Sequence, residues 1–272
     1  NHAQGFAFGA KSLGLMAYIV MPITTPSIKV NSVKNFGGKV ILHGDNFDEA
    51  LQHAKELVKN EGYTFIHPYD DKDVIAGQGT IGKELIEQIN TGIDAIFVPV
   101  GGGGLIAGLG TYVKALSPKT KIIGVEPEDA ACLKLALDNN KRLSLSEVGL
   151  FADGVAVKQI GKETFSLIKE WIDDVVTVSV DEMCASVQDT FQETRTVPEP
   201  AGALALAGLK KYCQSRGLKN KQLVAINSGA NLNFDRLGHI VERVQLGESE
   251  EALLSVKIPE EKGSFRRFCN FL

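Results

Sequence analysis

Short apolar runs alternate with segments of helical periodicity along most of the chain. The mainly apolar runs predict strands at 17–21, 39–42, 64–66, 95–100, 121–125, 175–178 and 222–226. Apolar positions at helical spacing predict helices at 47–59, 81–89, 105–116, 130–137 and 201–212, and Asp181 is expected to cap a further helix. Strands that alternate with helices form parallel sheets covered by helices, so the pattern predicts an α/β fold.

Ligands of such folds bind beyond the carboxyl ends of parallel strands, where loops lead into helices. Residues near Gly101, Glu126 and Asn227 directly follow predicted strands. We therefore expect functional groups at these three places.

The pattern changes after about residue 246. An acidic stretch, Gly247-Glu-Ser-Glu-Glu251, precedes an apolar run at 252–258, read as a strand, and an amphipathic segment at 265–271. One strand and one helix cannot bury their own apolar faces. We interpret this tail as the opening of a further domain and expect the chain to be cut within it.

Composition narrows the functional classes. The chain has 272 residues, a net charge of -4 and a pI of about 5.8, which argues against nucleic acid as a partner. The uncharged stretch 95–113 resembles a membrane span in length, but it contains Pro99 and four consecutive glycines, so a strand, loop and helix explain it better. The four cysteines and five histidines show no metal-ligand spacing, and we expect reduced thiols and no metal.

The strongest local signal is Val98-Pro-Val-Gly-Gly-Gly-Gly-Leu105. Glycines at a strand-to-helix junction leave backbone N–H groups unobstructed, and the helix start adds partial positive charge, so the loop suits a phosphate. It is not a P-loop, because Ile106 and Ala107 replace the Lys and Ser/Thr of that motif. Gly102-x-Gly104-x-x-Ala107, followed by Glu126, also matches a dinucleotide fingerprint, which leaves a dehydrogenase as an alternative at this point.

Three smaller clusters are weaker by themselves. In Asn1-His-Ala-Gln-Gly5 a small polar residue can cap a helix, and His2 is a candidate base. Ser228 follows a predicted strand and can donate a hydrogen bond to a heteroaromatic nitrogen, but it lacks the elbow of a nucleophilic serine. Glu199 stands between two prolines and either faces a pocket or a cation, or is simply a charge at a helix start.

Together and in this order, these segments resemble the biosynthetic threonine dehydratases, pyridoxal phosphate enzymes of the tryptophan synthase β fold (fold type II). The resemblance rests on Asn1–Gly5, Ile75-Ala-Gly-Gln-Gly-Thr80, Pro99–Leu105, Gly149–Val157, the segment that starts at Glu199 and Ser228-Gly-Ala-Asn231. It covers nearly the whole chain, and Ile258-Pro-Glu-Glu-Lys-Gly-Ser-Phe265 resembles the start of the family's C-terminal regulatory domain. This resemblance favours one phosphate over a dinucleotide.

The resemblance implies specific roles in binding pyridoxal 5'-phosphate. The backbone of Gly101, Gly102, Gly103, Gly104 and Leu105 is expected to bind its phosphate, Asn1 its 3'-oxygen and Ser228 its pyridine nitrogen. A serine hydroxyl does not keep that nitrogen protonated as an aspartate would, which weakens the ring as an electron sink. The implied reaction converts L-threonine to 2-oxobutanoate and ammonia.

Two parts of the family pattern are missing. The family's Schiff-base lysine and a serine/glycine loop lie upstream of the position of Asn1, so no catalytic residue is assigned in this chain. Lys11 is the nearest lysine in sequence, about 15 Å away along a helix. We expect a chain that is truncated at both ends and inactive without the upstream lysine.

We expect the chain to consist of three parts. A smaller lobe is expected at 1–67, a larger cofactor-binding lobe at 68–246 and the start of the regulatory domain at 247–272. The resemblance further implies a cytoplasmic homotetramer inhibited by isoleucine, with neither a nucleic acid nor a membrane as partner. A serine dehydratase or racemase, and a catalytically silent fragment, remain as alternatives.

Overall fold

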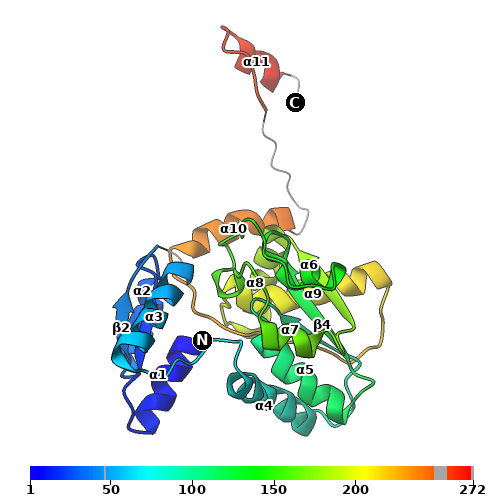
Figure 1. The fold of residues 1–272 in the computed structure, drawn as a ribbon. Coiled ribbons are helices and arrows are strands. Elements are labelled where there is room, and N and C mark those ends of the chain that lie inside the picture. Colours follow the sequence, from blue (N-terminus) through cyan, green and yellow to red (C-terminus); the bar gives the residue numbers. More distant parts are fainter. Residues whose placement is uncertain (46, 248–255, 271–272) are drawn as a thin grey trace.

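The strands form two separate parallel sheets (Figure 1). The computed structural model describes residues 1–45, 47–247 and 256–270. Both sheets are covered by helices, which confirms the predicted α/β fold with parallel sheets. No helix in these ranges combines the length and the apolar character that a bilayer crossing requires, and the uncharged stretch 95–113 is divided between a strand, a loop and a helix.

The smaller sheet contains two strands. β1 (Tyr18–Met21) pairs in parallel with β2 (Lys39–Leu42), and α2 (Ser27–Asn35) connects them. α1 (His2–Ser12) packs on α2, while α3 (Phe47–Glu61) packs on β1. The core between these elements is formed by Met21 together with small and β-branched side chains: Ala7, Ala10, Ala17, Ile19, Val30 and Val33.

The larger sheet has the strand order β5-β4-β3-β6, and all pairs are parallel. Its strands are β3 (Ala95–Pro99), β4 (Lys121–Pro127), β5 (Asp174–Val178) and β6 (Leu223–Ala225). Every residue of β3 is buried, as expected for a central strand that helices cover on both sides.

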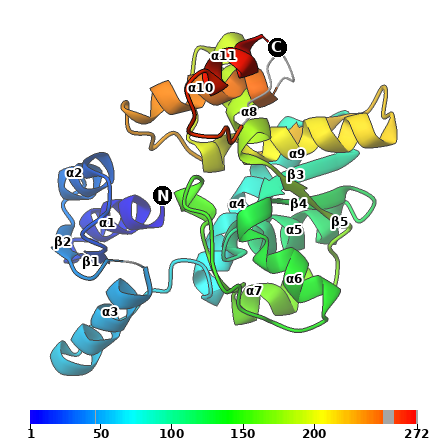
Figure 2. The ribbon, with the colours of Figure 1, turned by 90° about the horizontal axis from the view of Figure 1, so that it is seen from above.

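Helices cover the two faces of this sheet, as Figure 2 shows. One face carries α4 (Lys72–Gln88), α5 (Gly104–Leu116), α6 (Cys132–Asp138) and α7 (Lys162–Ile168). The other carries α8 (Val180–Thr194) and α9 (Pro200–Arg216), and α10 (Arg236–Gly247) packs on α8. Two short 3-10 turns, Glu128–Ala130 and Asp153–Val155, lie in the connections.

The predicted strand at 64–66 is wrong, whereas the other strands predicted in the two sheets are present within two residues of their expected ends. The aromatic side chains of this segment stack locally instead. Tyr63 stacks on Tyr18 with ring centroids 4.8 Å apart, and Phe65 meets His67 edge-on at 5.9 Å. A short apolar run becomes a strand only where a neighbouring strand accepts its backbone hydrogen bonds.

Two helix starts also differ from expectation. Ser179, not Asp181, caps α8: its hydroxyl accepts from Glu182 N at 3.2 Å, and the Glu182 carboxylate accepts from Ser179 N at 2.7 Å. Asp181 instead pairs with Arg243 of α10 at 2.7 Å. α4 begins well before residue 81, because Asp71 accepts hydrogen bonds from the first backbone N–H groups of the helix.

The glycines of α4 weaken its helical pattern in the sequence. In the structure they allow α4 to pack closely against α5. A Cβ at Gly79 would lie 3.3 Å from the Gly108 carbonyl oxygen of α5, and a Cβ at Gly108 would collide with the α4 backbone. The two helices therefore approach each other through their backbones.

The tail follows the prediction only in part. Residues 256–258 form no strand, and 252–255 of the predicted strand lie outside the described residues. The amphipathic segment is the short helix α11 (Ser264–Cys269).

Candidate functional site

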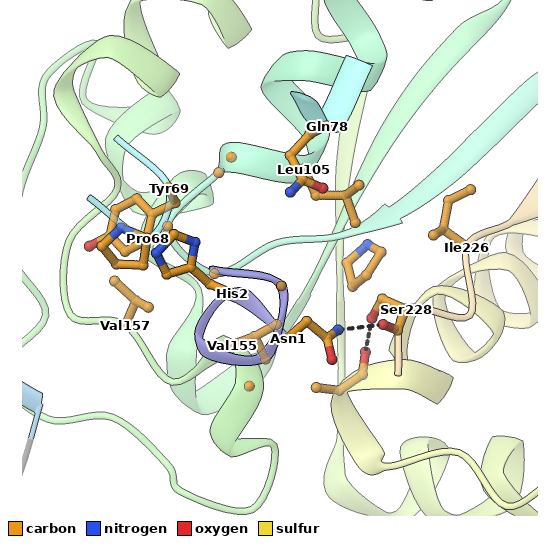
Figure 3. Close-up of a pocket in the computed structure, with 18 of the residues that line it drawn as sticks. Asn1, His2, Pro68, Tyr69, Gln78, Leu105, Val155, Val157, Ile226 and Ser228 are labelled. Atoms are coloured by element: carbon orange, nitrogen blue, oxygen red, sulfur yellow. Dashed lines mark hydrogen bonds between the residues drawn. The ribbon is translucent and has the colours of Figure 1, made fainter. Parts of the chain in front are cut away.

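A cavity of about 820 Å³ lies between the elements of the two sheets (Figure 3). It is lined by α1, by α4 and the connection before it, by the loop between β3 and α5, by the turn at Asp153–Val155 and by the segment after β6. Its lining includes each residue that the sequence singled out for a cofactor or pocket: Asn1, Gly101, Gly102, Gly103, Gly104, Leu105, Glu199 and Ser228. The fold thus brings together segments that are far apart in sequence.

The loop Gly101–Leu105 offers unpaired hydrogen-bond donors. It lies at the carboxyl end of β3, and α5 begins at Gly104. Among the residues that the structure describes, none accepts a hydrogen bond from the backbone N–H groups of Gly101 to Leu105. Because these donors coincide with the positive end of the α5 dipole, the loop is suited to an anion such as phosphate.

Close packing explains why the loop consists of glycines. A Cβ at Gly101 would lie 2.9 Å from Val155 Cα, and a Cβ at Gly102 would collide with the Tyr69 ring. Gly103 has a φ of +90°, a conformation that other residues rarely adopt. Residues with side chains are therefore excluded from the loop by its close neighbours and by its backbone conformation.

A hydrogen-bond network connects α1 with the segment after β6. Asn1 Nδ2 donates to the Ser228 carbonyl oxygen at 2.6 Å, and Asn231 Nδ2 donates to Asn1 Oδ1 at 2.9 Å. Gln4 Nε2 donates to Asn231 Oδ1 at 3.1 Å. Asn1 is the N-cap residue of α1, but its side chain makes no capping hydrogen bond, so the cap considered from the sequence is wrong. Its carboxamide instead forms hydrogen bonds with the segment after β6, at the wall of the cavity (Figure 3).

The Ser228 hydroxyl is only weakly engaged. Its Oγ donates to the Ala201 carbonyl oxygen over 3.4 Å, close to the limit for a hydrogen bond. Both partners line the cavity, so the hydroxyl can rotate toward a ligand at little cost.

Glu199 is a buried carboxylate at the cavity wall. It is 6% exposed, and its Oε2 has no hydrogen-bond partner among the described residues. Burial raises the pKa of Glu199, and the Lys29 ammonium opposes that shift. Lys29 itself pairs with Asp153 at 2.7 Å. The described residues contain no group of three His, Cys, Asp or Glu side chains that could hold a metal ion.

Glu126 does not face a ligand, although the dinucleotide pattern singled it out. Its carboxylate is fully buried and accepts from Leu133 N at 2.7 Å and Lys134 N at 2.9 Å, at the start of α6. Burial raises the pKa of Glu126 to about 7, although these hydrogen bonds act in the opposite direction. Its role is to cap a helix, which removes the acid that a dinucleotide ribose would need.

Two cavity residues, Tyr69 and Lys29, carried no sequence signal of their own. Tyr69 lies against the glycine loop, and Lys29 with Asp153 bridges α2 and the turn at Asp153–Val155. His2, considered as a base, also lines the cavity, and burial lowers its pKa, which favours the neutral imidazole.

Donors at a helix start, at the carboxyl edge of a parallel sheet, place the chain in the class of α/β proteins that bind a phosphate-bearing ligand. Residues 1–229 match the family described as pyridoxal-phosphate dependent enzyme. The chain belongs to this family, and its fold is fold type II of these enzymes.

Individual relatives agree with this assignment. The chain is 52% identical over its full length to L-threonine dehydratase biosynthetic IlvA of Burkholderia multivorans, of which it covers 54%. It is 54% identical to the protein of that name from Escherichia coli and covers 53% of it. The structure of the processed form of threonine deaminase isoform 2 from Solanum lycopersicum has 48% identity and a TM-score of 0.87; the match covers 90% of this chain and 68% of that one.

The chain spans about half the length of the curated relatives that it matches.

Pyridoxal phosphate, the cofactor of the family, fits the cavity. The loop N–H groups that have no protein acceptor can donate hydrogen bonds to its phosphate, and the cavity volume exceeds the volume of one cofactor molecule.

Proposed function

We propose that the full-length protein of which this chain is part is a threonine ammonia-lyase, which converts L-threonine to 2-oxobutanoate and ammonia in isoleucine biosynthesis. The observation that carries this proposal is the convergence of the glycine loop, Asn1 and Ser228 on one cavity. The relatives named as biosynthetic threonine dehydratases, which are 52% and 54% identical over the whole chain, support the choice of substrate.

The residues that would hold pyridoxal 5'-phosphate come from three segments. The backbone N–H groups of Gly101 to Leu105 bind the phosphate, Asn1 binds the 3'-oxygen and the Ser228 hydroxyl meets the pyridine nitrogen. When bound, the cofactor supplies an electron sink for the charge that develops at the substrate α-carbon. A lysine ahead of Asn1 in the full-length protein would hold the cofactor covalently.

The chemistry of Ser228 suits an elimination reaction. A hydroxyl donates a hydrogen bond to an unprotonated nitrogen but cannot supply a full positive charge to it. With such a hydrogen bond from Ser228, the ring would stabilise charge at the α-carbon only weakly, which would favour loss of the β-hydroxyl over reprotonation. We propose that Glu199 faces the same pocket and stays protonated more readily than an exposed glutamate, because its environment is buried.

The remaining proposals concern the organisation of the protein. Residues 1–67 form the smaller lobe, 68–246 the larger cofactor-binding lobe and 247–272 the start of a C-terminal regulatory domain. The greater length of the relatives is compatible with such a domain. The full-length protein is a cytoplasmic homotetramer, and isoleucine inhibits it.

The activity is tested with purified full-length protein that has been loaded with pyridoxal phosphate. Release of 2-oxobutanoate from L-threonine is the expected result, with inhibition when isoleucine is added. Borohydride reduction followed by mass spectrometry should label a lysine upstream of Asn1. Cofactor loading without any keto-acid release from threonine contradicts the activity, and racemisation of serine without sensitivity to isoleucine identifies the racemase-like alternative.

A further inference from the structure

The carbonyl group of Gly102 is fixed from behind the glycine loop. Its oxygen accepts hydrogen bonds from Thr164 Oγ1 at 2.8 Å and from Gly161 N at 3.1 Å. Thr164 is fully buried in the first turn of α7, so its hydroxyl does not exchange this partner for water. Two donors on one carbonyl hold the peptide group between Gly102 and Gly103 in a single orientation.

The start of α7 is held in turn by Asp70. Its carboxylate accepts from the backbone N–H groups of Lys162 at 2.8 Å, Glu163 at 2.8 Å and Thr164 at 3.2 Å. A Cβ at Gly161 would collide with this carboxylate, so the glycine allows the close approach. Asp70 lies in the connection between α3 and α4, which also carries Tyr69 against the loop.

The orientation of the Gly102 carbonyl decides where the next N–H group points. In a trans peptide the C=O and N–H groups point in opposite directions. Since the Gly102 oxygen points to α7, the Gly103 N–H points away from α7. No residue of α7 lines the cavity, whereas Gly102 and Gly103 do, so this N–H lies on the cavity side.

We propose that Thr164 is a positioning residue for the phosphate site: through the Gly102 carbonyl it directs the Gly103 N–H toward the phosphate of the cofactor. Thr164 does not touch the ligand itself. The inference rests on the proposed function, because it assumes that the glycine loop binds a phosphate. It adds α7 and Asp70 to the structures that maintain this site.

The test measures binding of pyridoxine 5'-phosphate and of pyridoxine to full-length protein from which the cofactor has been removed. Neither ligand carries the aldehyde, so binding is non-covalent and the difference between them isolates the phosphate. Thr164→Val replaces the hydroxyl by a methyl group of similar volume. We expect it to weaken binding of pyridoxine 5'-phosphate by about tenfold, corresponding to about 1.4 kcal/mol, and to leave binding of pyridoxine unchanged.

Two variants serve as controls. Thr120→Val removes a buried hydroxyl that donates to the Ile93 carbonyl oxygen at 2.8 Å, away from the cavity, and should leave binding of both ligands unchanged. Thr164→Ser keeps the hydroxyl and should bind pyridoxine 5'-phosphate within twofold of the parent protein. Equal affinities for Thr164→Val and Thr120→Val overturn the inference, as does equal weakening of both ligands.

A second measurement does not depend on the variants folding. Hydrogen–deuterium exchange in the peptide that carries Gly101–Leu105 should slow when pyridoxine 5'-phosphate binds the parent protein, but not when pyridoxine binds. Binding without this protection overturns the inference even if Thr164→Val does not fold. If the parent protein does not discriminate between the two ligands, it is the proposed phosphate site that fails.

Discussion

The side chain of Asn1 donates a hydrogen bond to the backbone carbonyl oxygen of Ser228 at 2.6 Å, although 227 residues separate them in sequence. With Asn231, which donates to the same carboxamide at 2.9 Å, this contact joins the start of α1 to the carboxyl edge of the larger sheet. Two groups proposed to hold the cofactor ring are thereby placed relative to each other before a ligand arrives. Such preorganisation lowers the entropic cost of binding.

Asn1→Ala tests this relationship in the full-length protein. The substitution leaves the Ser228 carbonyl and the Asn231 amide without their partner, so we expect cofactor binding to weaken by about tenfold, in line with the loss of about 1 to 2 kcal/mol. An absorbance titration with pyridoxal phosphate measures the change. Gln52→Ala, on the exposed side of α3, is the control and should bind as the parent protein does. Unchanged affinity in Asn1→Ala would contradict the role of the network.

Gly102→Ala should abolish phosphate-dependent binding. The added Cβ collides with the Tyr69 ring, so the loop or the ring must move and the N–H groups lose their arrangement. We expect at least a hundredfold loss of affinity for pyridoxine 5'-phosphate, measured by calorimetry, since several charge-assisted hydrogen bonds depend on the loop.

Gly77→Ala is the control variant. Gly77 lies in the interior of α4, and a Cβ added there meets nothing within 4 Å. The substitution should therefore stabilise the protein by about 0.5 to 1 kcal/mol.

Glu126 should make the stability of the protein depend on pH. Burial raises its pKa from 4.5 to about 7 in the folded state, so the native state binds more protons than the unfolded state within this window. The free energy of unfolding therefore falls as pH rises from about 4.5 to about 7, by about 3 kcal/mol in total from this group. Glu126→Gln removes the titrating group. Its free energy of unfolding should therefore fall by about 3 kcal/mol less than that of the parent protein over the same pH range.

Urea denaturation at several pH values measures these profiles. Glu84→Gln, on the exposed side of α4, is the control and should retain the slope of the parent protein. Parallel profiles for Glu126→Gln and the parent protein would show that Glu126 does not carry the effect.

The ion pair between Lys29 and Asp153 should couple α2 to the turn at Asp153–Val155. Its charged atoms are 2.7 Å apart, and the side chains are 20% and 33% exposed, so water screens the pair only in part. In a double-mutant cycle with Lys29→Met and Asp153→Asn we expect a coupling free energy of about 0.5 to 1 kcal/mol that decreases as salt is added. Thermal unfolding of the four proteins measures it, and additive effects of the two substitutions would rule the coupling out.

The sequence predicted those features that depend on neighbouring residues. The uniformly apolar run at 95–100 is a buried strand, and the glycines that follow it form the loop at the start of α5. Helix starts were less predictable. The glycines of α4 weaken its helical pattern, and they are present because the backbones of α4 and α5 touch, which is a property of the pair rather than of either segment.

By itself, the sequence determined the parallel α/β architecture, the family resemblance and those cavity residues that stand in motifs, because periodicity and motifs are properties of the linear chain. Only the tertiary structure decided how these residues act together. Asp70 reaches α7, Thr164 reaches the Gly102 carbonyl and Lys29 reaches Asp153 across 124 residues. Contacts between residues so distant in sequence leave no local pattern, because they arise from the packing of whole elements and not from the preferences of any one of them.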